Sequence, residues 1–212
     1  GRTYAEAKRF LATADRSDKA IMCAMCIRFW PAYNYLKEAV DRGQFGKTLS
    51  VNLRRVAQHP GGPFYENGDQ CGGALLDLHI HDTDFVHYLF GLPNSVTSTG
   101  YSKITNCIDH VVTSYDYDDI PMVVTEGGWA MTAGFGFNMA FTANFENATL
   151  VFDMSSENQL MLYEVGKEGL PVTVSEAMGY ELEIDYLLKC IAAGEKPTTV
   201  TLQSAAQTLA IC

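Results

Sequence analysis

The stretches Met139-Ala-Phe-Thr-Ala-Asn-Phe145 and Thr149-Leu-Val-Phe-Asp-Met154 decide the fold that we expect for this chain. In each, large apolar residues alternate with small or polar residues, which is the pattern of a β-strand with one buried face. The run 49–53 alternates in the same way, and similar runs separated by turn-like segments recur between residues 95 and 174. These runs predict a mostly antiparallel sheet.

The segment before residue 31 has a different character. Thr3 and Glu6 have the spacing of a capping box, which predicts a helix from Thr3 onward. Residues 19–27 are apolar on both sides of the pleat, as in a central strand of a parallel sheet. No other helix–strand units precede this strand, so we interpret residues 1–30 as the remnant of a domain that begins before Gly1.

Helical patterns flank the sheet. Pro31 suits the first turn of a helix that stops at Gly43, a second helix is closed by Gly194, and a third opens near Thr201 and is still running at the chain end. The fold class that we expect is therefore α+β. It comprises an open, mostly antiparallel sheet with helices packed on one face, preceded by an orphaned helix and strand. Residues 31–212 form this domain, whose C-terminal end we interpret as truncated.

Composition narrows the classes of function. The chain has 47% hydrophobic and 19% charged residues, as expected for a globular protein. Its formal net charge of -10 disfavours both nucleic acid and anionic membrane surfaces as partners. No apolar run approaches a membrane span, and the first residues lack the features of a signal peptide, so we expect a cytoplasmic protein. The pair Cys23-x-x-Cys26 lacks the second pair of a zinc site, and we interpret both as free thiols.

The segment 71–91 carries the candidate chemistry. Asp77, His81, Asp84 and Tyr88 form one stripe at helical spacing. A carboxylate and an imidazole one turn apart can form a hydrogen bond that fixes the ring tautomer and raises the basicity of the histidine. Asp77 and His81 are therefore a candidate general acid–base unit. The alternative, a surface helix with a charged outer face, fits the spacing equally well.

A metal site at His79-x-His81 is a weaker hypothesis. On a helix, residues two apart point about 200° from each other, so these two rings could not bind one ion. We therefore expect no metal site.

The order of motifs resembles the glucose-fructose oxidoreductase and inositol dehydrogenase (Gfo/Idh/MocA) family. The matching elements are Gly72-Gly73-Ala-Leu-Leu-Asp77-x-x-x-His81-Asp82-x-Asp84, the helix–strand–helix order upstream of it, and the tail from Gly179 to Pro197. The resemblance implies an N-terminal Rossmann domain that binds NAD or NADP, and a small-molecule substrate such as a sugar or polyol. It also implies that residues 1–30 are the remnant of that dinucleotide-binding domain. Asp77 and His81 would face nicotinamide and substrate as the catalytic pair, with His81 as acid–base group.

The chain also departs from the family pattern. It has no glycine-rich phosphate loop, so we expect this fragment to bind no NAD(H) or NADP(H) and to be inactive by itself. His79 replaces a glycine that is usual in the family, and either shapes the substrate pocket or packs. Arg28 is a candidate for binding substrate hydroxyls, or pairs with a surface carboxylate. His59 lies in a Gly- and Pro-rich loop and is either a substrate-binding residue or an ordinary exposed histidine.

Homo-oligomerisation is a further expectation. We assign the following apolar side chains to a sheet face that helices do not cover: Tyr115, Tyr117, Val123, Trp129, Met139, Phe141 and Phe145. An exposed apolar face usually marks an interface, and members of the family that the chain resembles pair through this sheet. The alternative to an enzyme is a non-catalytic sugar-binding or oligomerisation module on the same scaffold.

Overall fold

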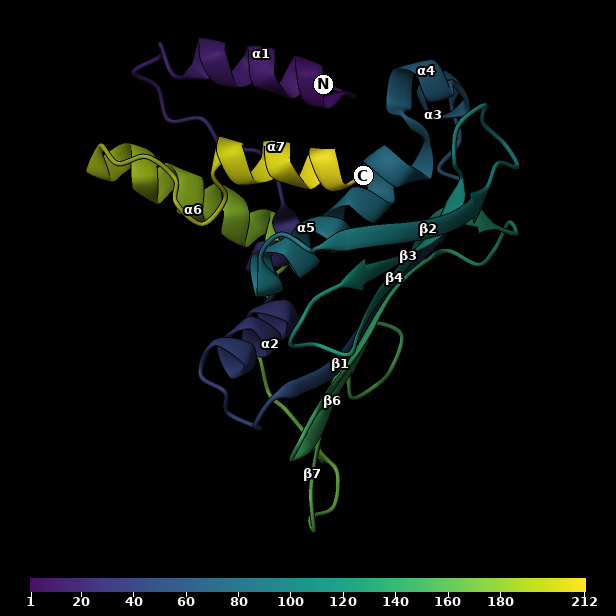
Figure 1. Ribbon diagram of the computed structural model, residues 1–212, viewed down its shortest axis with the longest axis vertical. Helices are drawn as coiled ribbons and strands as arrows, with labels where there is room; N and C mark the ends of the chain where they lie inside the picture. Colours follow the sequence, from purple (N-terminus) through teal and green to yellow (C-terminus); the bar gives the residue numbers. More distant parts are fainter.

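The computed structural model describes all residues, 1–212, and is organised around a single eight-stranded sheet. The strands lie in the order β2-β3-β4-β1-β5-β6-β7-β8, and only β1 and β4 run parallel (Figure 1). Their bounds are β1 Thr48–Gln58, β2 Ser95–Tyr101, β3 His110–Asp116, β4 Met122–Met131, β5 Phe137–Phe145, β6 Ala148–Asp153, β7 Leu160–Glu164 and β8 Leu170–Pro171. The expected mostly antiparallel sheet is confirmed.

Alternation along the strands separates a buried face from a polar one. Phe141 on β5 is paired with Phe152 on β6 and with Leu53 on β1, and all three are at most 2% exposed. Their neighbours Thr142 and Val151 are paired on the opposite face and are partly exposed. The inner face therefore carries the core, as the sequence pattern predicted.

Two helices cover that inner face, as Figure 1 shows. Helix α2 (Pro31–Asp41) has Pro31 in its first turn, and helix α5 spans Ile80–Phe90. Tyr33 of α2 is fully buried, and its ring packs edge-on against Phe85 of α5 at a centroid distance of 4.9 Å and Phe141 at 5.1 Å. The expected placement of helices on one face is confirmed.

The remaining helices extend the molecule beyond the sheet. Helix α1 (Tyr4–Ala14) lies beside α7 (Leu202–Ile211), while α6 (Gly179–Ala193) contacts the 3-10 helix η1 (Cys26–Phe29) (Figure 1). The Thr3–Glu6 capping box is present, and Gly194 ends α6 in a left-handed conformation. None of the helices combines the length and apolar character that crossing a bilayer requires.

The strand expected at residues 19–27 is wrong. Residues 19–25 form no regular secondary structure, and Cys26–Phe29 forms a 3-10 turn instead. A strand is defined by hydrogen bonds to a neighbouring strand, and the only sheet in the described residues includes no partner for this segment. Its apolar residues bury against helices instead, with Met25 and Phe29 packed near Val200.

The apolar face proposed for self-association is also assigned wrongly. Six of its seven side chains are buried, at most 5% exposed: Tyr115, Val123, Trp129, Met139, Phe141 and Phe145. Tyr117 packs against the same core from its edge. The alternation was correct, but these residues point toward the helices, and the outer face carries polar groups such as the Arg54–Glu126 ion pair. These seven residues therefore give no argument for an oligomer.

Candidate functional site

Two glycines introduce the segment that carries Asp77 and His81. Gly72 and Gly73 both have positive φ, at 84° and 70°. A Cβ on Gly73 would lie 2.6 Å from the backbone oxygen of Ile108, so the close approach of two backbones requires glycine here. These residues follow two short helical turns, α3 (Pro63–Glu66) and α4 (Gly68–Cys71).

A π-helical turn, η2 (Leu75–His79), comes next and runs directly into α5. The helix ends at Gly91, which has a φ of 79°, as the sequence predicted. A π-turn holds more residues per turn than an α-helix, so it rotates the side chains before it relative to those after it. The sequence predicted one uninterrupted α-helix and therefore missed this change of phase between Asp77 and His81.

Asp77 lies within the π-turn and His81 in the first turn of α5. Partial burial raises the pKa of the Asp77 carboxyl. Burial, followed by the positive charge of Arg55, lowers the pKa of His81 to about 4. The imidazole is therefore neutral at pH 7, and its buried Nδ1 has no hydrogen-bond partner among the protein's groups.

The interaction expected between these two residues is absent. No hydrogen bond joins Asp77 to His81, and the basicity of His81 is lowered rather than raised. The physical reason is burial of the imidazole, with a smaller contribution from the positive charge of Arg55, and no bond to the carboxylate. That part of the prediction is wrong, whereas the assignment of both residues to acid–base chemistry stays a prediction.

Arg28 lies in a buried ion pair. Its Nε donates to Oδ2 of Asp84 and its Nη2 to Oδ1, both at 2.7 Å, and Nη1 donates to the Thr199 carbonyl oxygen at 2.7 Å. Both side chains are at most 4% exposed, so Asp84 does not belong to an exposed polar stripe with Asp77. Most of the donors of Arg28 are used within the protein, and its contact with substrate stays a prediction without structural support.

His79 is buried against the sheet. Its Nε2 lies 3.0 Å from Thr113 Oγ1 on β3 and 3.2 Å from Thr125 Oγ1 on β4. Burial lowers the pKa of His79 to about 4, and the ring fills the space above Gly127, where a Cβ would clash with it. In this structure His79 packs, which was one of the two roles considered for it.

His59 lies in the loop that follows β1. Its Nδ1 accepts the Gly61 N–H at 3.1 Å, and its ring packs edge-on against Trp129 at 5.2 Å. The ring is therefore held in place and only partly exposed. Whether it meets a substrate stays a prediction.

A second buried ion pair was missed from the sequence. Nε of Arg55 on β1 donates to Oδ2 of Asp82 on α5 at 2.9 Å, with both side chains at most 4% exposed. A signal was present, because Arg55 continues the inward-facing series of Val51 and Leu53. An arginine at such a position must find a buried partner.

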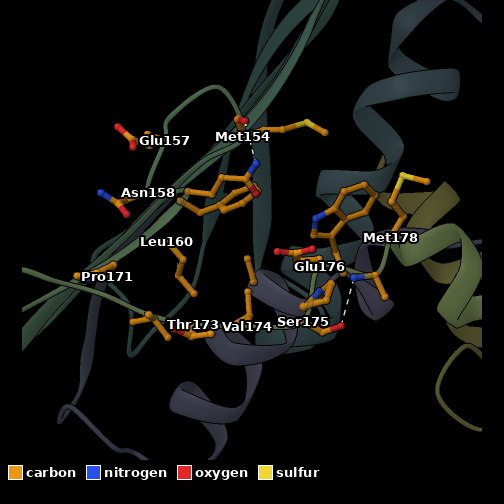
Figure 2. Close-up of a pocket in the computed structure, with 17 residues that line it drawn as sticks. Met154, Glu157, Asn158, Leu160, Pro171, Thr173, Val174, Ser175, Glu176 and Met178 are labelled. Carbon is orange, nitrogen blue, oxygen red and sulfur yellow. Dashed lines mark hydrogen bonds between the residues drawn. The ribbon is translucent and has the colours of Figure 1, made fainter.

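Two cavities of the chain lie away from Asp77 and His81. A cavity of about 490 Å³ lies between the 154–160 turn, the 171–178 segment and Trp30, with Asn158, Glu157 and Glu176 at its rim (Figure 2). An apolar cavity of about 420 Å³ lies between α1 and α7 and reaches Ile80. Neither is lined by Asp77 or His81. No three His, Cys, Asp or Glu side chains are grouped to bind a metal ion, and all cysteines are free.

Comparison with known proteins identifies a family whose model matches this chain, and relatives that resemble it. Residues 33–151 match the family model described as the GFO/IDH/MocA C-terminal domain. The chain is 23% identical over 190 residues to scyllo-inositol 2-dehydrogenase (NAD(+)) of Bacillus subtilis, covering 84% of this chain and 54% of that protein. It is 31% identical over 87 residues to myo-inositol 2-dehydrogenase of Thermotoga maritima, covering 41% and 25% respectively. The chain thus spans about half the length, or less, of these relatives.

Solved structures agree on the fold. A levoglucosan dehydrogenase in complex with NADH and levoglucosan superposes with a TM-score of 0.85 at 17% identity, covering all of this chain and 67% of that one. A UDP-N-acetylglucosamine 3-dehydrogenase from Acidithiobacillus ferrooxidans gives 0.78 at 20% identity, covering 98% and 64%. The α+β architecture described above is therefore shared with both.

Proposed function

Because this chain belongs to the GFO/IDH/MocA family through that family's C-terminal domain, we propose that it is the substrate-side domain of an NAD(P)-dependent oxidoreductase. Its substrate would be a sugar, a polyol or a related small carbinol or carbonyl compound. The observation that carries the proposal is the family match over residues 33–151. The printed names of relatives, which are inositol and dihydrodiol dehydrogenases, support the substrate class.

The residues present do not fit a complete dinucleotide site. The sheet is mostly antiparallel, its one parallel pair is β1 and β4, and no glycine-rich turn opens a long helix after a parallel strand. The pyrophosphate of NAD or NADP thus has no cradle in these residues. We expect the 212 residues alone to bind neither nucleotide and to be inactive, and titration calorimetry that detects micromolar binding would contradict this.

The chemistry assigned to this chain is proton transfer. His81 is neutral at pH 7 because burial and Arg55 disfavour its charged form, so it can accept a proton from a substrate hydroxyl. Asp77, whose carboxyl is raised in pKa by burial, is the second member of the proposed pair. The nicotinamide would supply the hydride acceptor. Cytoplasmic location and homo-oligomerisation remain parts of the proposal.

The test uses the longest form of the protein that contains this chain. NAD⁺ or NADP⁺ reduction is measured with a panel of inositols, monosaccharides and anhydrosugars, for the wild type and for His81→Ala. If His81 is the acid–base group, kcat falls by about 10²–10⁴-fold. His110→Gln is the matched control, because His110 binds Glu126 on the outer face of the sheet and is expected to leave turnover unchanged.

The outcomes separate the two functions considered. A wild type that oxidises none of these compounds, but binds one of them, favours the non-catalytic binding module. A His81→Ala variant within twofold of an active wild type removes His81 from the mechanism and leaves the oxidoreductase assignment standing.

A further inference from the structure

The π-turn η2 is attached to the sheet side of the molecule at both of its ends. At its first residue, the backbone N–H of Leu75 donates to the carbonyl oxygen of Ile108, in the loop before β3, at 3.3 Å. At its last residue, Nε2 of His79 lies 3.0 Å from Thr113 Oγ1 and 3.2 Å from Thr125 Oγ1. The turn is therefore held between two anchors, one made by the backbone and one by an imidazole.

His79 is the only side chain of the turn that bonds to the sheet. The other four residues are three leucines and Asp77, whose carboxylate forms no hydrogen bond within the protein. The direction in which Asp77 points is therefore set by the backbone of the turn and not by a bond of its own. Such π-turns are rare, and they are frequent at functional sites. Whatever holds the turn in this form also determines how Asp77 lies relative to His81.

The anchor at His79 continues into α5. Oγ1 of Thr125 lies 2.9 Å from Oη of Tyr115, which in turn lies 2.7 Å from Oγ1 of Thr83 in the first turn of α5. His79 and Thr83 are one helical turn apart, and all four side chains are at most 4% exposed. The same hydroxyl groups therefore hold the end of the π-turn and the start of α5 against the sheet.

Stability of the fold alone does not account for an imidazole at this position. Nδ1 of His79 is buried without a hydrogen-bond partner, and an unpaired buried polar atom destabilises the native state. The ring also requires a glycine at Gly127 on β4, where a Cβ would lie 2.5 Å from Nδ1, and glycine inside a strand weakens it. An apolar side chain of similar size would leave no unpaired atom. The contacts of Nε2 are what distinguish the imidazole from such a side chain.

We propose that His79 is a positioning residue: its bonds to Thr113 and Thr125 hold η2 as a π-turn, and the turn in that form sets the direction of Asp77 relative to His81. The catalytic use of that pair rests on the proposed function. The form of the turn is a property of this chain and can be measured without any substrate.

The matched variants are His79→Gln and His79→Asn. The terminal amide of glutamine extends about as far as Nε2 and can bond the threonine hydroxyls, whereas the shorter amide of asparagine ends near the position of Nδ1. Both variants lack the ring and keep a polar side chain, so they differ in the contact with Thr113 and Thr125. We expect His79→Gln to keep the π-turn and His79→Asn to lose it.

NMR of the deuterated protein measures the form of the turn directly. Couplings across hydrogen bonds identify the carbonyl group that each backbone amide binds, which is five residues back in a π-turn and four residues back in an α-helix. In His79→Asn the amides that close η2 should change to the four-residue pattern, and the signals of Asp77 should move with them. A folded His79→Asn variant that keeps the five-residue pattern overturns the proposal.

Two further variants separate positioning from a general loss of stability. Thr113→Val with Thr125→Val removes the same bonds from the strands and keeps the side-chain shapes, so it provides the test if His79→Asn does not fold. Retention of the π-turn in this folded double variant also overturns the proposal. His87→Leu is the control, because His87 bonds Thr208 at 3.1 Å from the same helix but lies after the π-turn. It should leave the hydrogen-bond pattern of η2 unchanged.

Kinetics provide the second measurement, in the longest form of the protein that contains this chain. A misplacement of about 1 Å can cost about 10²-fold in rate, so kcat per folded molecule should fall by about 10–10²-fold in His79→Asn, with KM little changed. His79→Gln should restore most of this loss. A role in stability alone would lower the unfolding temperature and leave kcat per folded molecule as it is.

The two measurements distinguish failure of this proposal from failure of the proposed function. Loss of the π-turn with kcat unchanged overturns the positioning role of His79 and leaves the oxidoreductase assignment standing. A wild type without dehydrogenase activity refutes the proposed function, and the NMR pattern then still decides whether His79 holds the turn.

Discussion

Helix α5 carries two buried aspartates, Asp82 and Asp84, that face opposite sides and meet two arginines in different ways. Arg28 binds Asp84 through two parallel bonds, and the carboxylate also accepts the hydroxyl of Thr208 at 3.0 Å. Arg55 binds Asp82 through one bond and leaves a donor and an acceptor without partners.

The two pairs differ in how completely the desolvation cost of their buried charges is offset. Around Arg28 the desolvation cost is offset by a complete set of partners that tie η1 to α5 and to the segment before α7. Around Arg55 the set is incomplete, and the residue beside it is the candidate proton acceptor. The complete pair holds elements of the fold together, whereas the incomplete pair leaves buried polar atoms without a partner.

Breaking the complete pair should have the largest effect. Arg28→Ala leaves Asp84 buried without a counter-charge, so the free energy of unfolding should fall by about 3–5 kcal/mol. Urea denaturation followed by circular dichroism measures this. Arg42→Ala removes an exposed ion pair with Glu38 and should cost at most about 0.5 kcal/mol. Equal losses for both variants would contradict the structural role of Arg28.

A drop in pH should lower the stability of the protein through His79 and His81. His79 and His81 have pKa values of about 4 in the native state against 6.5 for a free histidine. The unfolded chain therefore takes up protons that the native state does not, and the free energy of unfolding falls as pH drops from about 7 to 4. The loss is at most roughly 3 kcal/mol per histidine.

Urea denaturation at pH 7, 5.5 and 4.5 tests this dependence. His79→Gln should remove part of the slope, because glutamine does not titrate. A stability that is constant between pH 7 and 4.5 would show that neither histidine is protonated differently in the two states.

Removing a single hydroxyl beside the Arg28–Asp84 pair should have a smaller effect on stability. Thr208→Val removes the hydroxyl that donates to Asp84 and keeps the side-chain shape, so it should cost about 1–2 kcal/mol. Ser204→Ala removes a 3.4 Å contact with Arg28 and an exposed 2.9 Å bond to the Thr201 carbonyl oxygen, and should cost less. If Ser204→Ala cost more than Thr208→Val, the pair would be stabilised mainly by contacts of Arg28 and not by those of Asp84.

The smallest effect is expected when the incomplete pair is replaced as a whole. Arg55→Met with Asp82→Leu should leave the free energy of unfolding within about 1 kcal/mol of wild type or raise it, because apolar side chains replace a poorly offset pair. Thermal or urea unfolding measures this. A loss of several kcal/mol would show that the pair stabilises the fold after all.

Local patterns predicted the parts of this fold that depend on neighbouring residues. The Thr3–Glu6 capping box, the Pro31 helix start and the alternation in β5 and β6 each depend on a few adjacent residues, and all are confirmed. The sequence could not show which sheet face the helices cover, so Trp129 and Phe141 were placed on the wrong side. Residues 19–27 were apolar enough for a strand, but no strand lies beside them.

The site was predicted less completely for the same reason. Asp77 and His81 were selected by spacing, but the π-turn between them depends on packing against β3 and β4, which no local pattern encodes. The sequence showed only that Arg55 continues the series of inward-facing residues Val51 and Leu53 on β1. Its partner lies 27 residues further along the chain, on a different element.

The π-turn at Leu75–His79 also restricts how this segment can change in length. Removing one residue from it would let an ordinary α-helix run from Leu75 to Phe90. The same deletion would turn Asp77 by about 100° relative to His81 and draw Gly72 and Gly73 away from the backbone at Ile108. The deletion would thus give a more regular helix, but the residues before it would no longer be oriented correctly relative to α5.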